Sequence, residues 1–393
     1  MNPTPRPEPG PPRATPSAPS PAPASPAAPK APDAPDAPAP SPGPAVHRRR
    51  PRYPGRHPRR FEEKYKEHAP QLYPGEVAKV MAGGKTPAGM HRSVMVGEVL
   101  AALRPVPGET AVDCTLGYGG HARELLARLQ PAGRLLGLDV DPHELPRTES
   151  RLRAGGWGPD QLVVRASNFA GLARVLGELG WDGADVLLAD LGVSSMQMDN
   201  PERGFTFKAE GPLDLRLNPN RGLPASEWLR RADATRLAAA LRDHADEPHA
   251  DLLAAGLAQR RPAGRPTTTL ELAQAVREIL AAHGRGRDRE AANDSVRRVF
   301  QALRIEVNDE FGALEAWLRQ LPDCLRPGGR VAVLSFHSGE DRRVKHAFRE
   351  GHRRGLYSAV SDLPGRPGPA EIRANPRSAP ARLRWALRSG AGC

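Results

Sequence analysis

From about residue 90 onward, short apolar runs alternate with amphipathic stretches along the chain. The apolar runs that predict buried strands are residues 110–115, 134–140, 161–166, 184–192 and 329–336. A helix is predicted over 121–129, directly after a glycine-rich turn that follows the first strand. Because strands and helices alternate, the pattern predicts an α/β fold whose parallel sheet is covered by helices on both faces.

More than 130 residues separate the fourth predicted strand from the fifth, far more than one crossover helix needs. Part of this span, residues 295–321, is predicted as one long helix with an apolar stripe that faces the sheet. The stripe positions step by three and four: Phe300, Leu303, Val307, Phe311, Leu314 and Leu318. Residues 206–294 predict an inserted helical domain, with helices near 225–242, 249–261 and 268–283. Thr268 and Glu271 have capping-box spacing at the start of the last one.

The N-terminal segment has a different composition. Residues 1–60 contain 21 of the 44 prolines, together with many alanines and serines. Such a segment has little to bury, which predicts a disordered or polyproline-like tail over residues 1–75. The prolines exclude a secretory signal, which needs an unbroken apolar core, and no apolar run is long enough to span a bilayer. A cytoplasmic location without a membrane partner is therefore expected.

Charge adds a second property of this tail. The chain carries a net charge of +12, and ten Lys or Arg against three Asp or Glu place +7 of it in residues 1–60. Most of the positive charge lies in an arginine block within residues 48–60. A solvated basic tail and a nonspecific contact with phosphate both explain the block, and charge alone does not identify an RNA-binding protein.

The three cysteines are Cys114, Cys324 and Cys393, which form neither a CxxC pair nor a metal-binding spacing. They predict a reducing compartment and a fold that is held without disulfides or zinc.

The first candidate site is the run DCTLGYGGHA (113–122), between a predicted strand and a predicted helix. Its glycines allow a tight turn and a close approach to a ligand, and the helix N-terminus offers free N–H groups. Asp139 ends the next strand, where a carboxylate can accept hydrogen bonds from ribose hydroxyls. Gly117, Gly119 and Ala122 also satisfy G-x-G-x-x-A, so a nicotinamide-dependent dehydrogenase fits nearly as well. A glycine turn that binds no ligand is the third interpretation.

The second candidate site is DLGVSSMQ (190–197), at the C-terminal end of the fourth predicted strand. Ligands bind at that edge of open parallel sheets. A dehydrogenase has no particular need for Asp190, whereas a methyltransferase that acts on an exocyclic amine needs an acceptor for the amine protons. Ser194 and Ser195 are equally typical of a helix cap or a turn.

The third candidate site is RGFTF (203–207), which continues to GPLDLR (211–216). Phe205 and Phe207 can stack on an extruded base, with Arg203, Asp214 and Arg216 beside them. Two phenylalanines at this spacing are more often core residues.

The fourth candidate site is SFHSGEDR (335–342), which crosses from the fifth predicted strand into a helix. Ser338 and Asp341 have capping-box-like spacing. His337 lies at the expected cleft edge and either contacts a base or is a hydrogen-bonded structural histidine. His337 and Glu340 also suggest a zinc deaminase, but the cysteine pair of that class is absent from the sequence, which excludes it.

Eight runs together resemble one family, the bacterial 16S rRNA cytosine-N4 methyltransferases known as RsmH or MraW. The resemblance covers His91 to about Arg384. The runs are HRSVMVGEVL (91–100), DCTLGYGGH (113–121), DLGVSSMQ (190–197), RGFTF (203–207), GPLDLR (211–216), FQALRIEVN (300–308), SFHSGEDR (335–342) and NPRS (375–378).

The resemblance implies a class I S-adenosylmethionine methyltransferase fold, Rossmann-like, with an inserted helical domain. Together with the composition and the helical pattern, it gives an expected division into a first methyltransferase part (85–205), the insert (206–294) and a second methyltransferase part (295–390), with the tail (1–75) outside the resemblance. It implies S-adenosyl-L-methionine as cofactor and, as substrate, a decoding-centre cytidine of 16S rRNA in the small ribosomal subunit. The sequence allows a homodimer but does not fix the oligomeric state. By position, the cofactor-contacting residues fall on Gly119, Gly120, His121, Asp139, Phe169, Asp190 and Gln197, of which Phe169 and Gln197 come from the resemblance alone.

For the reaction, we expect direct attack by the N4 amine on the methyl group. Neither Cys114 nor Cys324 lies in the Pro-Cys motif of C5-cytosine enzymes, and Asp190 stands where the Asp-Pro-Pro-Tyr motif of many amino-methyltransferases begins. Asp190 is the expected proton acceptor, together with Asp214 or His337.

The chain departs from the family pattern at several places outside the cofactor motifs. Glu210 replaces an Asp, residues 294–296 replace His-Pro-Ala, His244 to Pro248 replace a Tyr-Gly-Glu-Glu-Arg-like run, and Ala379 and Pro380 replace an Arg and a Ser. Several of these fall on expected RNA-facing surfaces. An RNA-binding assembly protein without catalysis is therefore the alternative to the methyltransferase, beside the dehydrogenase.

Overall fold

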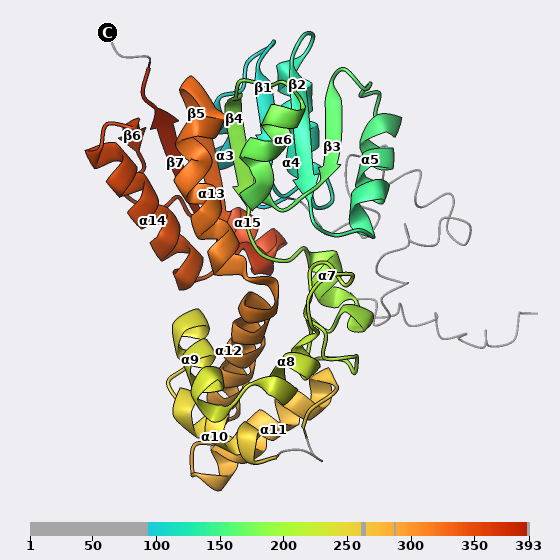
Figure 1. Cartoon of the computed structure of the whole chain (residues 1–393), viewed down its shortest axis with the longest axis vertical. Helices are drawn as coiled ribbons and strands as arrows, with labels where there is room; N and C mark the ends of the chain where they lie inside the picture. Colours follow the sequence, from blue (N-terminus) through green and yellow to red (C-terminus); the bar gives the residue numbers. More distant parts are fainter. Residues whose placement is uncertain (1–92, 261–264, 287, 391–393) are drawn as a thin grey trace, which may run out of the picture. The chain divides into compact units, whose positions relative to one another are not determined.

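The computed structural model describes residues 93–260, 265–286 and 288–390, so the predicted tail, His91 and Cys393 lie outside the described residues. Its centre is a seven-stranded sheet with the order β3-β2-β1-β4-β5-β7-β6 (Figure 1). The strands are β1 (Thr110–Asp113), β2 (Arg134–Asp139), β3 (Leu162–Ala166), β4 (Ala184–Asp190), β5 (Leu325–Ser335), β6 (Tyr357–Val360) and β7 (Arg382–Arg388). All five predicted strands are confirmed, although β5 begins at Leu325 instead of residue 329. β6 and β7 were not predicted.

The direction of the strands places the site. The pairs β3–β2, β2–β1, β1–β4 and β4–β5 are parallel, whereas β7 runs antiparallel to both β5 and β6. Strand order reverses between β1 and β4, so the connections leave these two strands in opposite directions. A crevice therefore opens at their carboxyl ends, which is where ligands bind in open α/β sheets.

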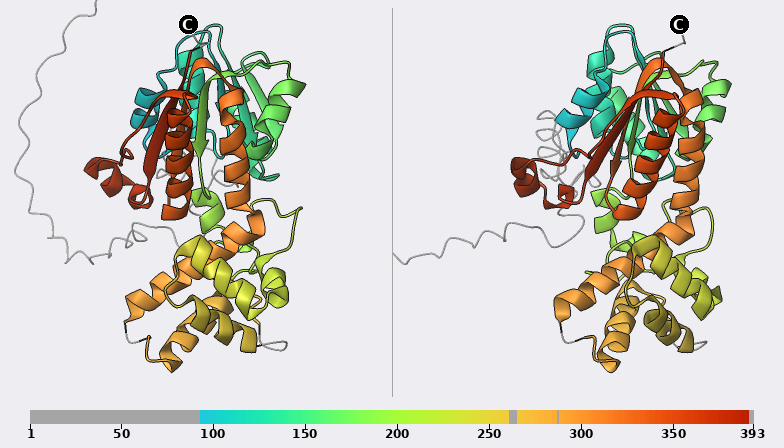
Figure 2. Two further views of the ribbon diagram at one scale, coloured as in Figure 1. Left: turned by 60° about the vertical axis from the view of Figure 1, so that its left-hand side comes forward. Right: turned by 90° about the vertical axis from the view of Figure 1, so that its left-hand side faces the viewer.

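Helices cover both faces of the sheet, as the two side views show (Figure 2). One face packs against α3 (Val96–Leu103), α4 (Gly120–Leu129) and α5 (Glu144–Ala154), and the other against α6 (Leu172–Glu178), α13 (Glu310–Cys324) and α14 (Ser338–Arg353). Alternate residues of a strand serve the two faces: Val186 and Leu188 join the first cluster, and Leu187 and Ala189 the second. Short elements complete this part: η2 (Phe169–Gly171), α7 (Ser195–Asp199), η3 (Pro201–Arg203), α15 (Pro369–Ala374) and η4 (Pro376–Ser378).

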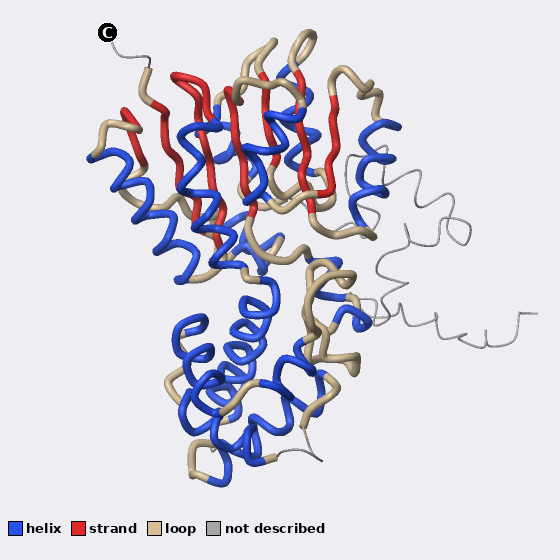
Figure 3. Tube along the Cα trace, viewed as in Figure 1, coloured by secondary structure: helices blue, strands red, loops and turns tan. Residues whose placement is uncertain are grey.

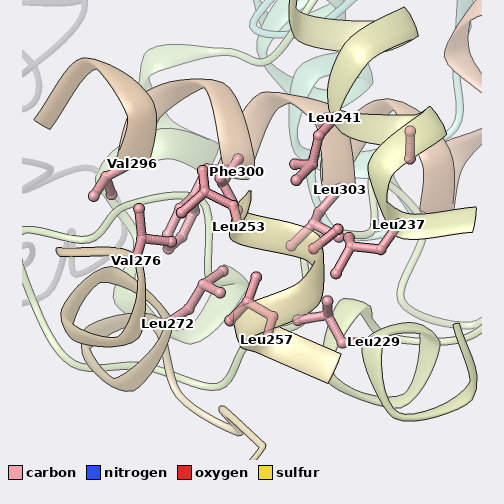
Figure 4. Close-up of a cluster of buried hydrophobic side chains, with 14 of the residues drawn as sticks. Leu229, Leu237, Leu241, Leu253, Leu257, Leu272, Val276, Val296, Phe300 and Leu303 are labelled. Atoms are coloured by element: carbon pink, nitrogen blue, oxygen red, sulfur yellow. The ribbon is translucent and has the colours of Figure 1, made fainter. Parts of the chain in front are cut away.

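The helical insert has a core of its own. It consists of α8 (Ala225–Arg231), α9 (Ala234–Ala245), α10 (Ala250–Gln259), α11 (Thr269–Ala282) and α12 (Arg289–Asn308), with no strand among its described residues (Figure 3). Leu241 and Leu253 meet Phe300 and Leu303 of α12 in this core (Figure 4). The predicted capping box is confirmed, because Thr268 accepts a hydrogen bond from the Glu271 N–H and Glu271 reaches back to Thr268.

The prediction of one long helix over 295–321 is wrong. The helix breaks at Asp309, which has φ 48° in the left-handed region and separates α12 from α13. Asp tolerates this conformation better than most residues, since its short polar side chain can hydrogen-bond locally. Phe300 and Leu303 consequently pack inside the insert, while Leu314 and Leu318 pack on the sheet. Only Leu314 and Leu318 of the predicted stripe pack on the sheet, and the sequence does not reveal this because a one-residue break leaves the three-and-four spacing unchanged.

Two further expectations concern membrane-spanning helices and the cysteines. Over the described residues, no helix is long and apolar enough to cross a membrane. Cys114 and Cys324 are buried free thiols.

Candidate functional site

A large cavity of about 1700 Å³ opens at the carboxyl ends of β1, β2 and β4. Its walls come from the loops after these strands, from the ends of β5 and α12, and from α13 and the α15–η4 segment. The predicted residues that line it are Gly119, Gly120, His121, Asp139, Phe169, Asp190, Gln197 and His337. The structure therefore brings together residues that are more than 200 positions apart in the chain.

The glycine loop forms one end of the cavity. Gly119 caps α4 with φ 81°, a conformation that L side chains rarely adopt. At Gly120 a Cβ would lie 2.0 Å from the hydroxyl oxygen of Ser93, so a larger residue here would require the Ser93 side chain to move. The free N–H groups of the first turn of α4, a ten-residue helix, and its positive dipole end lie at this wall.

Asp139 fixes the glycine loop from the end of β2. Its Oδ2 accepts a hydrogen bond of 2.7 Å from the N–H of Gly117, and its Oδ1 accepts one of 2.9 Å from the N–H of Asp141. Burial raises the pKa of Asp139, and the backbone N–H donors counter part of that rise. Each oxygen keeps a second lone pair, so the carboxylate can still accept from a ligand that carries hydroxyl groups.

Asp190 and His121 meet at the middle of the cavity wall. Nε2 of His121 lies 3.6 Å from Oδ2 of Asp190. The backbone N–H of Asp190 donates a hydrogen bond of 2.7 Å to Oγ1 of Thr115. Asp113 lies behind them, and burial raises its pKa to about 6. Burial lowers the pKa of His121, but the carboxylates of Asp190 and Asp113 outweigh it, so the net shift is upward. Asp113 and His121 thus both have pKa values shifted upward beside the cavity, and shifted titratable groups of this kind are typical of a site that handles protons.

Hydrogen bonds within the protein hold the side chain of Gln197 in place. Ser194 and Gln197 form a capping box at the start of α7, which confirms the helix-cap interpretation of Ser194. The Nε2 of Gln197 donates to Oδ2 of Asp141 at 2.7 Å. Asp141 also accepts from Nη1 of Arg203 at 2.6 Å, and Arg203 binds the carbonyl oxygen of Leu217.

Sequence reasoning missed Asp141, which is 1% exposed. Burial raises the pKa of this carboxyl, but Arg203 and Gln197 bring it below its usual value. Asp141 links the loop after β2 to Arg203, and through Arg203 to the segment that leads into the insert. The available signal was the second acid in Asp139-Val-Asp141, directly after a strand.

Phe169 supplies an apolar wall. It follows β3 in η2 and packs edge-on against Trp317 of α13, with ring centroids 5.8 Å apart. A flat aromatic face beside a fixed carboxylate suits a planar ring that carries a sugar.

His337 lies at the other end of the cavity, as the N-cap residue of α14. Its Nε2 is 3.2 Å from Oε1 of Glu340, yet neither ring nitrogen has a well-aligned hydrogen bond to any described residue. The predicted capping pair of Ser338 and Asp341 is wrong: Ser338 donates to Asp246, while Asp341 accepts from Arg384 at 2.6 Å.

Within the described part of the chain, one group of side chains has ligand atoms close enough for a metal ion. Glu310, His337 and Glu340 place one such atom each within 4.8 Å of the others. Both oxygens of Glu310 accept hydrogen bonds of 2.8 Å from Arg304. The guanidinium competes for the oxygens that a cation would need, so we assign no metal here.

Asp214 is not brought to the site. Asp214 is not among the described residues that line the cavity. Both of its carboxylate oxygens accept hydrogen bonds from Arg216, at 2.8 and 2.7 Å. The predicted grouping of Asp214 with Asp190 and His337 is therefore not reproduced. Phe205 is buried in the insert core, and Phe207 packs 5.5 Å from Phe300, so the core interpretation of these two aromatics is confirmed.

The model of the MraW methylase family matches residues 88–389. The chain is 45% identical over 345 residues to ribosomal RNA small subunit methyltransferase H 1 of Lachnoclostridium phytofermentans, covering 88% of this chain and 94% of that one. It is 47% identical over 342 residues to methyltransferase H 2 of Alkaliphilus metalliredigens, covering 87% and 97%. It is 44% identical over 344 residues to methyltransferase H 1 of Agathobacter rectalis, covering 87% and 98%.

Proposed function

We propose a reaction for this chain, which belongs to the MraW methylase family: transfer of a methyl group to the N4 amine of a cytidine in 16S rRNA of the small ribosomal subunit. Membership of a methylase family excludes the dehydrogenase interpretation of the glycine loop. The fold is that of a class I methyltransferase, and S-adenosyl-L-methionine is the cofactor. The names of the relatives, which are rRNA small subunit methyltransferases, support the proposed substrate.

The glycine-loop end of the cavity fits this cofactor. Gly119 and Gly120 give the close backbone approach, and Asp139 offers lone pairs to the ribose hydroxyls. Phe169 offers a face to the adenine ring, and His121, Asp190 and Gln197 complete the wall. When bound, S-adenosyl-L-methionine supplies an electrophilic methyl group and retains the electron pair of the broken S–C bond on sulfur.

The remaining volume supports a second ligand. Pockets for one small molecule are usually about 300–1,000 Å³, whereas this cavity measures about 1700 Å³. Enzymes that modify a base extrude it from its stack into such a pocket. Arg304 and Asn308 of α12 also line the cavity, so the insert supplies a wall that a target nucleotide would meet.

One observation carries the proposed chemistry: a carboxylate with an unpaired oxygen stands at the switch point of the sheet. Oδ1 of Asp190 is buried and has no hydrogen-bond partner among the described residues. The lone pair of an exocyclic amine is delocalised into the ring, so an acceptor that holds its protons favours a pyramidal, nucleophilic nitrogen. Asp190 accepts the proton that N4 loses as the new N–C bond forms. His337 contributes to holding the base at the far end of the same cavity.

The test uses the purified full chain with S-adenosyl-L-methionine and small ribosomal subunits from cells that lack this gene. We expect one N4-methylcytidine in 16S rRNA, mapped by mass spectrometry of nuclease fragments. Free 16S rRNA in a parallel reaction decides which form is the substrate. A methyl group on C5 would overturn the reaction class. Binding to the subunits without methylation would favour the assembly-protein alternative.

A further inference from the structure

Two unpaired polar atoms lie together on the cavity wall. In the part of the chain that the structure describes, neither Nε2 of His121 nor Oδ1 of Asp190 has a hydrogen-bond partner. The two side chains face each other at 3.6 Å, and they are 6% and 26% exposed. A buried polar group without a partner is energetically costly. The fold therefore places an imidazole and a carboxylate side by side, without a hydrogen bond between them, at the point where the reaction is proposed to occur.

We propose that His121 is a positioning residue for Asp190 and that its Nε2 takes over the proton which Asp190 has accepted from the amine. This inference rests on the proposed function, because it needs Asp190 to act as the first acceptor. His121 is in the first turn of α4, so the backbone of the glycine loop sets its place relative to β4. A movement of well under 1 Å turns the 3.6 Å contact into a hydrogen bond.

The proton balance of this step is simple. The amine nitrogen loses one proton as its N–C bond forms, and an oxygen of Asp190 gains it. The O–H bond then breaks as the Nε2–H bond forms, which leaves Asp190 as a carboxylate and His121 as an imidazolium. His121 returns the proton to water when the product has left. The competent enzyme therefore starts with a neutral His121, and a higher pH increases the fraction of molecules in that form.

The groups that face His121 come from three elements. Asp190 ends β4, Asp113 ends β1, and Glu124 is one turn further along α4. Asp139, at the end of β2, acts on Asp113. Burial lowers the pKa of His121, but Asp190, Asp113 and Glu124 together raise it above its ordinary value. His121 consequently keeps its proton to a higher pH than an ordinary histidine does, so the neutral form that the step needs is favoured as the pH rises.

The test compares His121→Gln with the wild-type chain in single-turnover reactions on small subunits at saturating S-adenosyl-L-methionine. Glutamine keeps a polar amide near the position of Nε2 but does not take up a proton. We expect the wild-type rate to rise with pH and level off. In the variant, this ascending limb should disappear or move by about one pH unit or more, and the plateau rate should fall about 10-fold to 100-fold. Calorimetry measures cofactor binding separately, since His121 also lines the cofactor end of the cavity.

Two results would overturn the inference. If His121 has only a structural role, the rate falls by the same factor at every pH and the limb stays where it is. If Asp113 is the titrating group, Asp113→Asn removes the limb while His121→Gln retains it. A wild-type profile that is flat across neutral pH also refutes it, whether or not the variant folds, and His121→Asn provides a second variant. These outcomes are distinct from failure of the proposed function, in which the wild-type chain itself makes no N4-methylcytidine.

Discussion

The two walls of the cavity are built in different ways. On the sheet wall, Asp139 and Asp190 end parallel strands; the carboxylate of Asp139 accepts from the N–H groups of Gly117 and Asp141, and the main-chain N–H of Asp190 donates to the hydroxyl of Thr115. On the insert wall, Arg297 and Arg304 project from one helix and are held by other side chains, Arg304 by Glu310 and Arg297 by Glu290. A backbone-fixed wall suits a small ligand of constant shape. A wall of paired side chains can exchange its partners for the phosphates and bases of a large RNA.

The largest expected effect is on the sheet wall. Asp190→Asn keeps the shape of the side chain and removes its charge, so turnover should fall by roughly two to four orders of magnitude, the usual share of a positioned proton acceptor. Single-turnover methylation at saturating S-adenosyl-L-methionine measures it, with cofactor affinity determined in parallel. Asp185→Asn is the matched control, because Asp185 is on the same strand at the opposite end and binds Arg326 and the N–H of Thr110. Near-normal rates for Asp190→Asn would remove this residue from the chemistry.

A second change tests the connection between the two walls. Arg203→Ala takes the cation away from Asp141, which is 1% exposed. A buried charge that loses its partner destabilises a protein by about 3–5 kcal/mol. Urea unfolding should show this loss, whereas Arg230→Ala, which breaks an exposed pair with Glu227, should leave the free energy of unfolding nearly unchanged. Equal losses for the two variants would mean that Asp141 finds another partner.

The sheet wall could be predicted residue by residue, for a physical reason. The carboxyl ends of parallel strands meet at one edge, so a residue that ends a strand, such as Asp139 or Asp190, is placed as soon as the strand is recognised. The glycine spacing places Gly119 and Gly120 in the same way. Asp141 was missed because its role depends on Arg203, which is 62 positions away in the chain.

The insert wall could not be predicted in this way, because its geometry depends on contacts between distant side chains. The apolar spacing is continuous through Asp309, so the sequence does not reveal the break that turns α12 away from the sheet. Asp214 carries the motif that suggested a catalytic acid, but the structure pairs it with Arg216 two residues later. In both cases a local left-handed conformation accompanies the change, at Asp309 itself and at Leu215 directly after Asp214.

The cofactor end of the sheet wall should show an intermediate effect. Asp139→Ala removes the proposed acceptor of the ribose hydroxyls and should weaken binding of S-adenosyl-L-methionine by about 1–3 kcal/mol, or roughly 5-fold to 150-fold. Calorimetry measures this directly. Asp160→Ala, in the exposed loop before β3, is the control and should leave the affinity unchanged. An unchanged affinity in Asp139→Ala would show that the carboxylate serves only to hold Gly117 and Asp141.

The smallest effect is expected on the insert wall, and a matched pair of arginines can detect it. Arg297 lines the cavity from α12, is 52% exposed and pairs with Glu290 and Asp294. Arg242 on α9 is 53% exposed and pairs with Asp251, but it is absent from the described residues that line the cavity. If RNA enters past α12, its phosphates can replace the weak surface pairs of Arg297.

Arg297→Ala should then lower RNA affinity several-fold and reduce the slope of log K against log salt by about 0.7–0.9, the value for one phosphate contact. Fluorescence anisotropy with a labelled 16S rRNA fragment at several salt concentrations measures both quantities. Arg242→Ala should change neither, and an equal response of the two variants would mean that the RNA is held by the overall positive charge of the chain and not by this wall.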